Sequence, residues 1–494
     1  MAVHSPDIRL TSNALTVLAR RYLRRDEEGK VIETPAEMFR RVSNNIAQAD
    51  LLYGHTDIGK TEEEFCSILS SLEFLPNSPT LMNAGRPLQQ LAACFVLPVE
   101  DSLESIFDAV KETALIHQSG GGTGFSFSHL RPKDDAVRTT GGAASGPVSF
   151  MKVFNMATEV IKQGGTRRGA NMGILRVDHP DILEFIAAKA DIRELWNFNI
   201  SVAVTEDFMK AVEADEEYSL VNPHSREVTT RLKAREVFER IVDSSWRNGE
   251  PGIVFIDRIN RDNPTPRIGA IESTNPCGEQ PLLPYESCNL GSLNLANMLC
   301  AENGHLRIDY ESLKAAVHTS VRFLDNVIDM NNYPLAEIRQ MTMGNRKIGL
   351  GVMGFADMLI RLGIPYDSDE ALAVGQEVMS FVQEESAAAS CNLARERGSF
   401  PNYDVSVFPD RGEIPRRNAT TTTIAPTGTI SIIAGVSSGI EPIFALSYIR
   451  NVMDNDHLLE AHPLFDAEMR RRGLYSLERM TEISKQGSLR HVEG

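Results

Sequence analysis

Closely spaced cysteines are absent from this sequence of 494 residues. It has no CxxC pair and no cysteine–histidine cluster at the spacing that binds zinc. A framework of structural disulfides is not expected in a reducing compartment. Without further context, each cysteine is interpreted as a small buried apolar residue. The six cysteines are Cys66, Cys94, Cys277, Cys288, Cys300 and Cys391.

The sequence also lacks an apolar run long enough to span a bilayer. Residues 1–15 do not join a basic stretch to an apolar core, as a signal peptide does. Basic residues are outnumbered, with 50 Lys and Arg against 67 Asp and Glu, which gives a net charge of -17. Such a chain repels the phosphate backbone of nucleic acids. We therefore expect a cytoplasmic protein that binds neither nucleic acid nor membrane, although a local patch could bind a small phosphorylated ligand.

The length exceeds that of a usual single domain, so we expect one large barrel or two domains. Residues 1–88 show apolar residues at helical spacing, with Ser12 as a candidate cap and Thr34-Pro35 as a second helix start. Residues 62–75 are a third candidate helix. We predict a helical domain over residues 1–88, followed by a second domain over residues 89–494.

From residue 89 onward, short apolar runs alternate with helical patterns. Residues 90–99 are typical of a buried strand. The helix predicted over 101–118 begins with a capping box of Asp101 and Glu104 and ends at Gly120. The alternation predicts an α/β fold with a largely parallel sheet, open or closed into a barrel. Further predicted strands cover 125–130, 170–177, 198–204, 286–295 and 421–433, and further helices cover 235–248 and 313–330.

The segment 274–295 carries the most chemistry. Asn275, Cys277 and Glu279 occupy every second position, so in an extended loop their side chains point the same way. A thiol can exchange a hydrogen atom, a carboxylate can take a proton from a hydroxyl, and an amide can hold a neighbouring oxygen. The alternative is a Pro/Gly turn with a buried cysteine and a surface glutamate.

Two further cysteines, Cys94 and Cys288, lie in predicted strands. A disulfide requires Cα atoms about 4.4–6.8 Å apart. Neighbouring strands are about 4.8 Å apart, so two strand cysteines meet this requirement if they are in register. The sequence alone leaves that register open.

Two glycine-rich segments could bind phosphate. Residues 425–433 offer small residues whose backbone amides can hold an anion, although the segment could also be a simple turn. Residues 162–173 contain four glycines and two arginines, which suits an anion-facing loop but is also common in solvated loops.

The motifs NPCGE and ESCNLGSLNL, preceded far upstream by AACFVLPVEDSLESI, resemble the large catalytic subunit of ribonucleotide reductases. The resemblance implies a ten-stranded α/β barrel behind an N-terminal helical domain. It assigns the thiyl radical to Cys277 and the activation of the ribose to Asn275 and Glu279. It makes Cys94 and Cys288 the pair that reduces the substrate. Cys66, Cys300 and Cys391 match no role in the family and are interpreted as core residues.

The same resemblance assigns two binding sites. The effector nucleotide, a deoxynucleoside triphosphate or ATP, is expected at the interface of a homodimer, with Asp101 at its ribose and Arg131 and Arg138 near its triphosphate. Residues 162–173 would link this effector to the choice of base, with Arg167 as the base-side contact. Asp101 could serve as a helix cap as well. The residues expected around the ribonucleotide substrate are Ser78, Ala93, Gly122, Thr427, Gly428, Thr429 and Ile430, and the segment 437–442 also matches the family.

The segments GGGTGFSFSHLRP and GGTRRGANMG resemble those of the adenosylcobalamin-dependent class II enzymes. In these enzymes a 5′-deoxyadenosyl radical oxidises the cysteine corresponding to Cys277. No DxHxxG cobalamin motif is present, but this class does not depend on one. An external dithiol of the thioredoxin type would reopen the Cys94–Cys288 disulfide. No N-terminal ATP-binding cone is visible, so overall regulation by ATP and dATP is not expected.

The chain ends at SLRHVEG, whereas family members usually continue to a cysteine-bearing tail. We therefore expect a fragment, half of a split enzyme whose partner polypeptide completes the barrel and supplies the tail, or a core that is active alone. An incomplete barrel would leave an unpaired strand edge, which proteins usually avoid.

Three alternatives stay open. The chain could be a class I large subunit that needs a separate metal-radical subunit, or a non-catalytic nucleotide-binding half of a split reductase. It could also be a glycyl-radical enzyme on the same barrel, although no glycyl-radical motif is present. The choice between diphosphate and triphosphate substrates is open as well.

Overall fold

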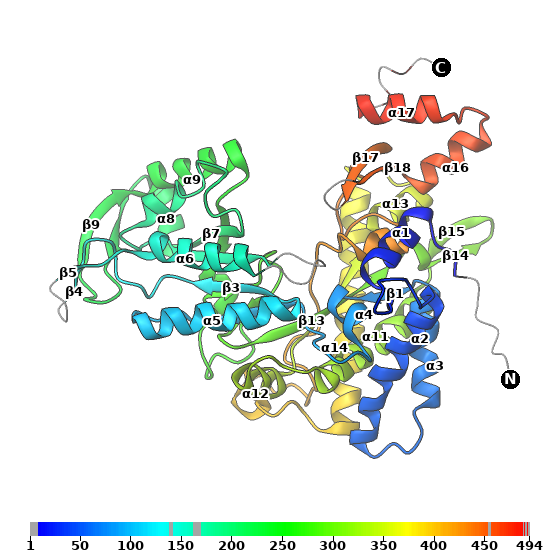
Figure 1. Cartoon of the computed structure of the whole chain (residues 1–494), viewed down its shortest axis with the longest axis horizontal. Coiled ribbons are helices and arrows are strands. Elements are labelled where there is room, and N and C mark those ends of the chain that lie inside the picture. Colours follow the sequence, from blue (N-terminus) through cyan, green and yellow to red (C-terminus); the bar gives the residue numbers. More distant parts are fainter. Residues whose placement is uncertain are drawn as a thin grey trace.

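The computed structural model describes residues 8–137, 142–161, 169–452 and 456–487, together with Leu489 and Val492. At its centre is a curled sheet of eight strands in the order β1-β13-β2-β3-β6-β7-β10, with β16 beside β13 (Figure 1). The strands are β1 (Phe74–Pro76), β2 (Cys94–Leu97), β3 (Gly122–Ser126), β6 (Asn171–Arg176), β7 (Phe198–Val204), β10 (Gly252–Phe255), β13 (Ser287–Asn294) and β16 (Ile348–Met353).

The sheet consists of two parallel groups joined in antiparallel fashion. Strands β2, β3, β6, β7 and β10 are parallel to one another, and β13 is parallel to β16. The groups meet where β13 pairs antiparallel with β2, and β1 also pairs antiparallel with β13. Helices connect the parallel strands, as crossover connections require. This is an α/β fold that forms an incomplete barrel, in agreement with the predicted alternation.

The first group is covered by the helices that follow its strands (Figure 1). A cluster of buried phenylalanines fixes helix α6 on strands β3 and β7. The ring of Phe154 lies 4.8 Å from that of Phe125 and 5.5 Å, edge-on, from that of Phe127. Such tilted and edge-to-face contacts are favourable for aromatic rings. These helices are α5 (Leu103–Ser119), α6 (Pro147–Val160), α7 (Ile182–Ile186), α8 (Glu206–Ala214), α9 (Ala234–Asn248) and α10 (Ile256–Arg261).

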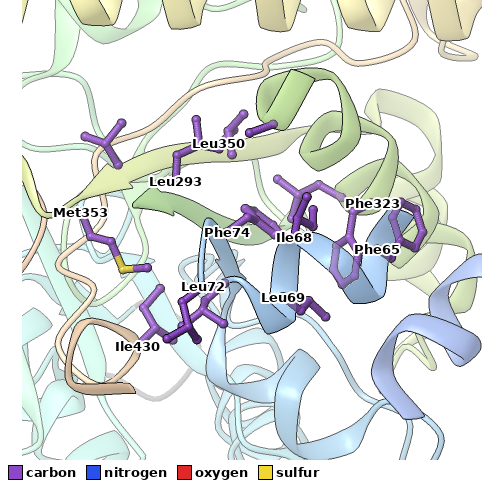
Figure 2. Close-up of a cluster of buried hydrophobic side chains, with 14 of the residues drawn as sticks. Phe65, Ile68, Leu69, Leu72, Phe74, Leu293, Phe323, Leu350, Met353 and Ile430 are labelled. Carbon is purple, nitrogen blue, oxygen red and sulfur yellow. The ribbon is translucent and has the colours of Figure 1, made fainter. Parts of the chain in front are cut away.

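The N-terminal helices pack on the second strand group. Phe65 of α3 lies 5.0 Å from the ring of Phe323 in α11, which in turn lies 5.4 Å from Phe74 of β1. Leu293 and Leu350 of the sheet belong to the same buried cluster (Figure 2). The helical region and the sheet therefore share one hydrophobic core. The N-terminal helices are α1 (Ser12–Arg21), α2 (Pro35–Ala47), α3 (Gly59–Ser70) and α4 (Ser78–Asn83). The later helices of this region are α11 (Tyr310–Met330), α12 (Ala336–Asn345), α13 (Phe355–Leu362) and α14 (Asp369–Arg397).

Of the three predicted helix starts, the one at Thr34-Pro35 is confirmed. Thr34 and Glu37 form the capping box of α2, with Pro35 as its first residue. The predicted cap Ser12 is wrong by one position, because the Thr11 hydroxyl accepts the Ala14 amide at 3.1 Å.

The predicted capping box of α5 is wrong. Helix α5 begins at Leu103, and the Ser102 hydroxyl accepts the Ser105 amide at 3.1 Å. Asp101 precedes this cap, and its carboxylate accepts instead from the backbone and side chain of Arg131. The end of the helix at Gly120 is as predicted.

The strand predicted over 421–433 is also wrong. Only one bridge forms, parallel between Thr422 and Leu350, and the five-residue helix α15 (Ile430–Ala434) follows. Pro426 has no amide to extend a ladder, and Thr427 has a φ of +52° in the left-handed region. The chain therefore turns where the hydrophobic pattern predicted a strand.

The smaller elements form hairpins and a C-terminal helical pair. Among the described residues no helix combines the length and apolar character needed to cross a membrane. These elements are β4 (Ala136–Val137), β5 (Gly142–Ala143), β8 (Glu217–Val221), β9 (Val228–Lys233), β14 (Leu299–Glu302), β15 (His305–Ile308), β17 (Ser447–Val452), β18 (Asp456–Ala461), α16 (Pro463–Arg471) and α17 (Leu477–Gln486).

Candidate active site

A short hairpin carries the central motif. Strands β11 (Ser273–Thr274) and β12 (Pro281–Leu282) pair antiparallel, and residues 275–280 form the loop between them. The Asn275 amide donates to the Gln280 carbonyl at 3.1 Å, and the Gln280 amide donates to the Asn275 side-chain oxygen at 3.0 Å. Gly278 has a φ of +86°, which other residues rarely adopt. These contacts fix the 273–282 hairpin and place Cys277 at its tip.

Glycines in β3 allow this hairpin to lie against the sheet. A Cβ atom at Gly124 would come within 1.7 Å of the Thr274 carbonyl oxygen, and one at Gly122 within 2.8 Å of the Pro276 ring. The Asn199 side chain of β7 donates to the Pro276 carbonyl at 2.7 Å. Close approach of two backbones requires residues without a side chain. The hairpin is thus held against the inner strands of the first group.

The hairpin brings the predicted residues around Cys94. The Asn275 side-chain nitrogen donates to the Cys94 sulfur at 3.1 Å, and both residues are buried. Cys277 is exposed and Glu279 is half-buried. The Thr423 hydroxyl donates to the Glu279 carbonyl at 2.9 Å and anchors this side of the loop.

Cys94 and Cys288 face each other across the strand junction. They are Cα partners in the antiparallel pairing of β2 with β13. Residues directly opposite in such a pair have Cα atoms about 4.5–5.5 Å apart, within the range that a disulfide spans. Both side chains are buried. The register that the sequence left open therefore allows these two thiols to form a disulfide.

The environment of these two thiols keeps them protonated. Burial raises the pKa of Cys94 well above its ordinary value, and the nearby Glu279, Cys288 and Cys277 raise it further. Burial also raises the pKa of Cys288, against the opposing charge of Lys347. At neutral pH both sulfurs carry hydrogen and can donate it.

A buried ion pair beside Cys288 was not singled out from the sequence. The Lys347 ammonium lies 2.6 Å from the Glu286 carboxylate, and each side chain is at most 2% exposed. Glu286 also accepts from the Leu283 amide at 2.6 Å and from the Asn345 side chain. Glu286 lies within the ESCNLGSLNL motif, but Asn345 and Lys347 come from a distant segment. The sequence could identify the acid and not the base.

The predicted phosphate segment is held to the segment 437–442. The Thr427 hydroxyl accepts the Gly439 amide at 2.7 Å, and the hydroxyls of Ser431 and Ser438 are 3.0 Å apart. Ala425 packs in a small apolar cluster with Cys94 and Cys288, so this segment adjoins the paired thiols. Gly428, Thr429 and Ile430 continue from Thr427 into α15.

The remaining predicted substrate residues are Ala93 just before β2, Gly122 in β3 and Ser78 in α4. Gly122 is the partner of Cys94 in the next strand, and its amide donates to the Ala93 carbonyl at 2.9 Å. Ser78 begins α4, and its hydroxyl lies 2.7 Å from the Tyr22 hydroxyl. A cavity of about 470 Å³ borders Ser431 and residues 435–438.

The predicted effector residues are only partly described. The Arg131 guanidinium contacts the Asp101 carboxylate at 2.8 Å, and the Arg131 amide donates to it at 3.2 Å. Arg138 and Arg167 lie outside the described residues, as does most of the 162–173 loop. Asp101 and Arg131 are therefore brought together, at the carboxyl ends of β2 and β3.

The other three cysteines have different environments. Cys66 and Cys391 are buried, as predicted. Cys300 lies in the β14–β15 hairpin and is only partly buried, so its interpretation as a core residue is wrong. The residues that follow it in β14, Ala301 and Glu302, are exposed, so this part of the hairpin lies at the surface.

Comparisons with known proteins match this architecture. Residues 8–89 match the family model described as "Ribonucleotide reductase, all-alpha domain" and residues 92–494 match "Ribonucleotide reductase, barrel domain". The chain therefore belongs to the ribonucleotide reductase family and is an enzyme. Its incomplete α/β barrel with N-terminal helices agrees with the fold that the motifs implied.

Its similar relatives narrow the class. The chain is 52% identical to a vitamin B12-dependent ribonucleoside-diphosphate reductase of Thermoplasma acidophilum, over 99% of the chain and 70% of that protein. It is 49% identical to a protein of the same description from Mycobacterium tuberculosis strain H37Rv, over 98% of the chain and 68% of that protein. Identity to the ribonucleoside-diphosphate reductase subunit alpha of Chlamydia pneumoniae is 28%, over 94% of the chain and 51% of that protein.

Proposed function

We propose that this chain reduces ribonucleoside diphosphates to 2′-deoxyribonucleotides by thiyl-radical chemistry on Cys277, with adenosylcobalamin as the radical source. The observation that carries the proposal is the arrangement of three thiols. Cys94 and Cys288 face each other in register, and Asn275 joins Cys94 to the hairpin that presents Cys277. The diphosphate substrate and the cofactor are proposed because the relatives at 49–52% identity are named for them.

The hairpin residues begin the reaction. The sulfur radical of Cys277 takes the hydrogen atom from C3′ of the ribose, and the Glu279 carboxylate takes the proton of the 3′-hydroxyl. The carbon radical then lies next to C2′, which assists loss of the 2′-hydroxyl as water. The Asn275 side-chain oxygen already accepts the Gln280 amide, so its nitrogen is directed toward the site.

The paired thiols complete the reduction. Cys94 and Cys288 together supply two electrons and two protons, and they end as a disulfide. One turnover thus converts one ribonucleotide and two thiols into one deoxyribonucleotide, one disulfide and one water. The 3′-hydrogen returns from Cys277, which regenerates its radical. An external dithiol of the thioredoxin type then reduces the disulfide by exchange.

The exposure of Cys277 fits a radical source bound outside the sheet. Cys277 is exposed, whereas the other two thiols are buried. When bound, adenosylcobalamin supplies a one-electron oxidant for a thiol. Only Cys277 of the three is accessible to such a group, and burial of Cys94 and Cys288 separates them from it. This difference supports the assignment of the radical to Cys277.

We propose the substrate and effector sites because these segments resemble those of the family. Residues 427–430 with segment 437–442 would hold the substrate phosphates, beside Ser78, Ala93 and Gly122. Asp101, Arg131, Arg138 and Arg167 would serve an effector nucleotide. The contact between Asp101 and Arg131 supports a site there, because a ribose hydroxyl and a phosphate could compete for these two charged groups.

We propose the effector site at the interface of a homodimer. Helices α5 and α6 lie side by side on one face of the molecule (Figure 1). Both helices expose large apolar side chains, and exposed apolar side chains gathered together are typical of an interaction surface. They are Leu103, Phe107, Leu115, Met156 and Val160.

We also propose a domain boundary and a cellular location. The boundary between domains at residues 88 and 89 is supported by the separate family models for residues 8–89 and 92–494. A cytoplasmic location is supported by the need for reduced thiols and an external dithiol.

Product formation tests the proposed function. The protein is incubated with CDP, adenosylcobalamin and dithiothreitol, and dCDP is measured by chromatography. The proposal predicts dCDP from the wild type and none from Cys277→Ala. A class I subunit would give dCDP only with a metal-radical subunit, and a binding protein would give none under either condition.

A radical measurement separates the roles of the thiols. Cys94→Ala and Cys288→Ala should lose turnover but still form an electron paramagnetic resonance signal with adenosylcobalamin. Cys277→Ala should lose both. Equal loss of the signal in all three variants would contradict the assignment.

A further inference from the structure

Two pairs of opposite charges connect the ends of β2 and β3. Glu100 and Asp101 follow β2, and His129 and Arg131 follow β3. The His129 Nδ1 atom lies 2.9 Å from the Glu100 carboxylate, and Arg131 contacts Asp101 at 2.8 Å. These contacts fasten the segment that carries the proposed effector residue Asp101 to the one after β3.

His129 also reaches a third segment. Its Nε2 atom lies 2.9 Å from the carboxylate of Glu272. Glu272 immediately precedes β11, three positions before Asn275 and five before Cys277 in the chain. His129 therefore bridges the strand ends near Asp101 and the base of the 273–282 hairpin. None of the sequence motifs pointed to this contact.

We propose that His129 is a positioning residue, which holds the base of the 273–282 hairpin and transmits changes at Asp101 to Cys277. It touches none of the reacting groups. The coupling rests on the effector site proposed above, whereas the clamping of the hairpin rests only on the contacts with Glu100 and Glu272.

Both contacts require a charged imidazole. Only the imidazolium donates from both ring nitrogens at once, so loss of the proton removes one of the two contacts. The bond to Glu272, followed by that to Glu100, raises the pKa of His129 to about 9 against the opposing effect of burial. His129 is therefore charged at neutral pH, and both contacts are made.

The charged groups around the clamp come from several segments. Arg176 of β6 faces Glu272 and is itself paired with Asp178 at 2.7 Å, with Asp257 of α10 nearby. His224 lies 3.6 Å from Asp101. The proton of His129 is lost near pH 9.

The direction of the pH effect follows from the raised pKa. A histidine with a higher pKa in the folded state contributes stability that is fully present below its unfolded pKa of about 6.5. That contribution is lost as the pH rises through about 9. Because His129 and its partners are partly exposed, the effect should be local to the hairpin and small for the whole molecule.

Hydrogen–deuterium exchange of the whole chain tests the clamp without requiring catalysis. In His129→Gln, amides of residues 271–283 should exchange about fivefold faster than in the wild type at pH 7, the effect of losing the partly exposed ion pairs with Glu100 and Glu272. The ratio should approach one at pH 10, where wild-type His129 has lost its proton. The matched control is His318→Gln, which removes a histidine–glutamate contact of 2.7 Å between α11 and α14. It should leave the hairpin peptide unchanged.

Two results would overturn the clamp. One is equal exchange of residues 271–283 in the wild type and His129→Gln at pH 7. The other is a difference that persists undiminished at pH 10, which would reflect packing and not the charge.

A second arm tests the coupling with dTTP as the probe. Added dTTP should change exchange at residues 271–283 in the wild type and not in His129→Gln, while both proteins bind it. Equal changes in both would refute the coupling. Failure of dTTP to bind either protein would refute the proposed effector site, and the pH comparison would still decide the clamp.

Discussion

At the scale of single residues, the site divides its thiols into one accessible group and two enclosed ones. Spacing alone marked Asn275, Cys277 and Glu279 as candidates, because alternate positions share a direction. The facing of Cys94 and Cys288 could not be predicted from spacing, because it depends on the pairing of strands almost two hundred positions apart. The Lys347–Glu286 pair has the same long-range origin.

The difference between the thiols predicts their reactivity. With limiting iodoacetamide at pH 8, Cys277 should be alkylated at least about tenfold faster than Cys94 or Cys288, because a raised pKa lowers the thiolate fraction and burial blocks access. Peptide mass spectrometry of the alkylated chain measures the three rates. Comparable rates for all three thiols would show that the paired cysteines are not enclosed.

The buried ion pair beside Cys288 predicts a large effect on stability. Lys347→Met leaves Glu286 charged and unpaired in the interior, which should lower the free energy of unfolding by about 3–5 kcal/mol. Urea denaturation followed by circular dichroism measures it. The double variant Lys347→Met, Glu286→Leu should recover much of the loss. A single variant as stable as the wild type would show that the carboxylate is not effectively buried.

At the scale of elements, the 273–282 hairpin can lie against β3 because Gly122 and Gly124 leave room where the two backbones meet. Periodicity correctly predicted β7 and the body of most helices. Periodicity failed at 421–433, where Pro426 and the left-handed Thr427 turn the chain. The predicted capping box failed at Asp101, whose carboxylate accepts from Arg131. Both failures lie in segments proposed to bind nucleotides, and the one at Asp101 arises from a contact with a residue distant in the sequence.

The hairpin contact predicts an effect of one methyl group. Gly124→Ala places a Cβ atom in the position of the Thr274 carbonyl, so the hairpin must move and dCDP formation should fall at least about a hundredfold. Far-UV circular dichroism should change little. Gly269→Ala is the control, because its nearest contact would be 3.7 Å, an ordinary packing distance. Full activity in Gly124→Ala would contradict the seating of the hairpin.

At the scale of the whole molecule, the alternation of strands and helices predicted the fold class but not the junction of the two parallel groups. That junction is set by the antiparallel meeting of β2 and β13. The predicted helical region was found at the N-terminus, yet it shares its hydrophobic core with the sheet (Figure 2). Periodicity identifies an apolar face without identifying what covers it.

The apolar face of α5 and α6 predicts the oligomeric state. Sedimentation velocity should show a dimer for the wild type and mainly a monomer for the double variant Phe107→Glu, Val160→Glu, because two charges would be buried at the interface. The control is Leu372→Glu on α14, which is 72% exposed and lies on another helix. An unchanged dimer in the double variant would place the interface elsewhere.

A turnover without external dithiol decides whether Cys94 and Cys288 reduce the substrate. The fully reduced chain is mixed with CDP and adenosylcobalamin, and dCDP and disulfides are measured in the same sample by chromatography and peptide mass spectrometry. We expect a Cys94–Cys288 disulfide formed in equal amount with dCDP. Formation of dCDP while Cys94 and Cys288 both remain thiols would contradict it.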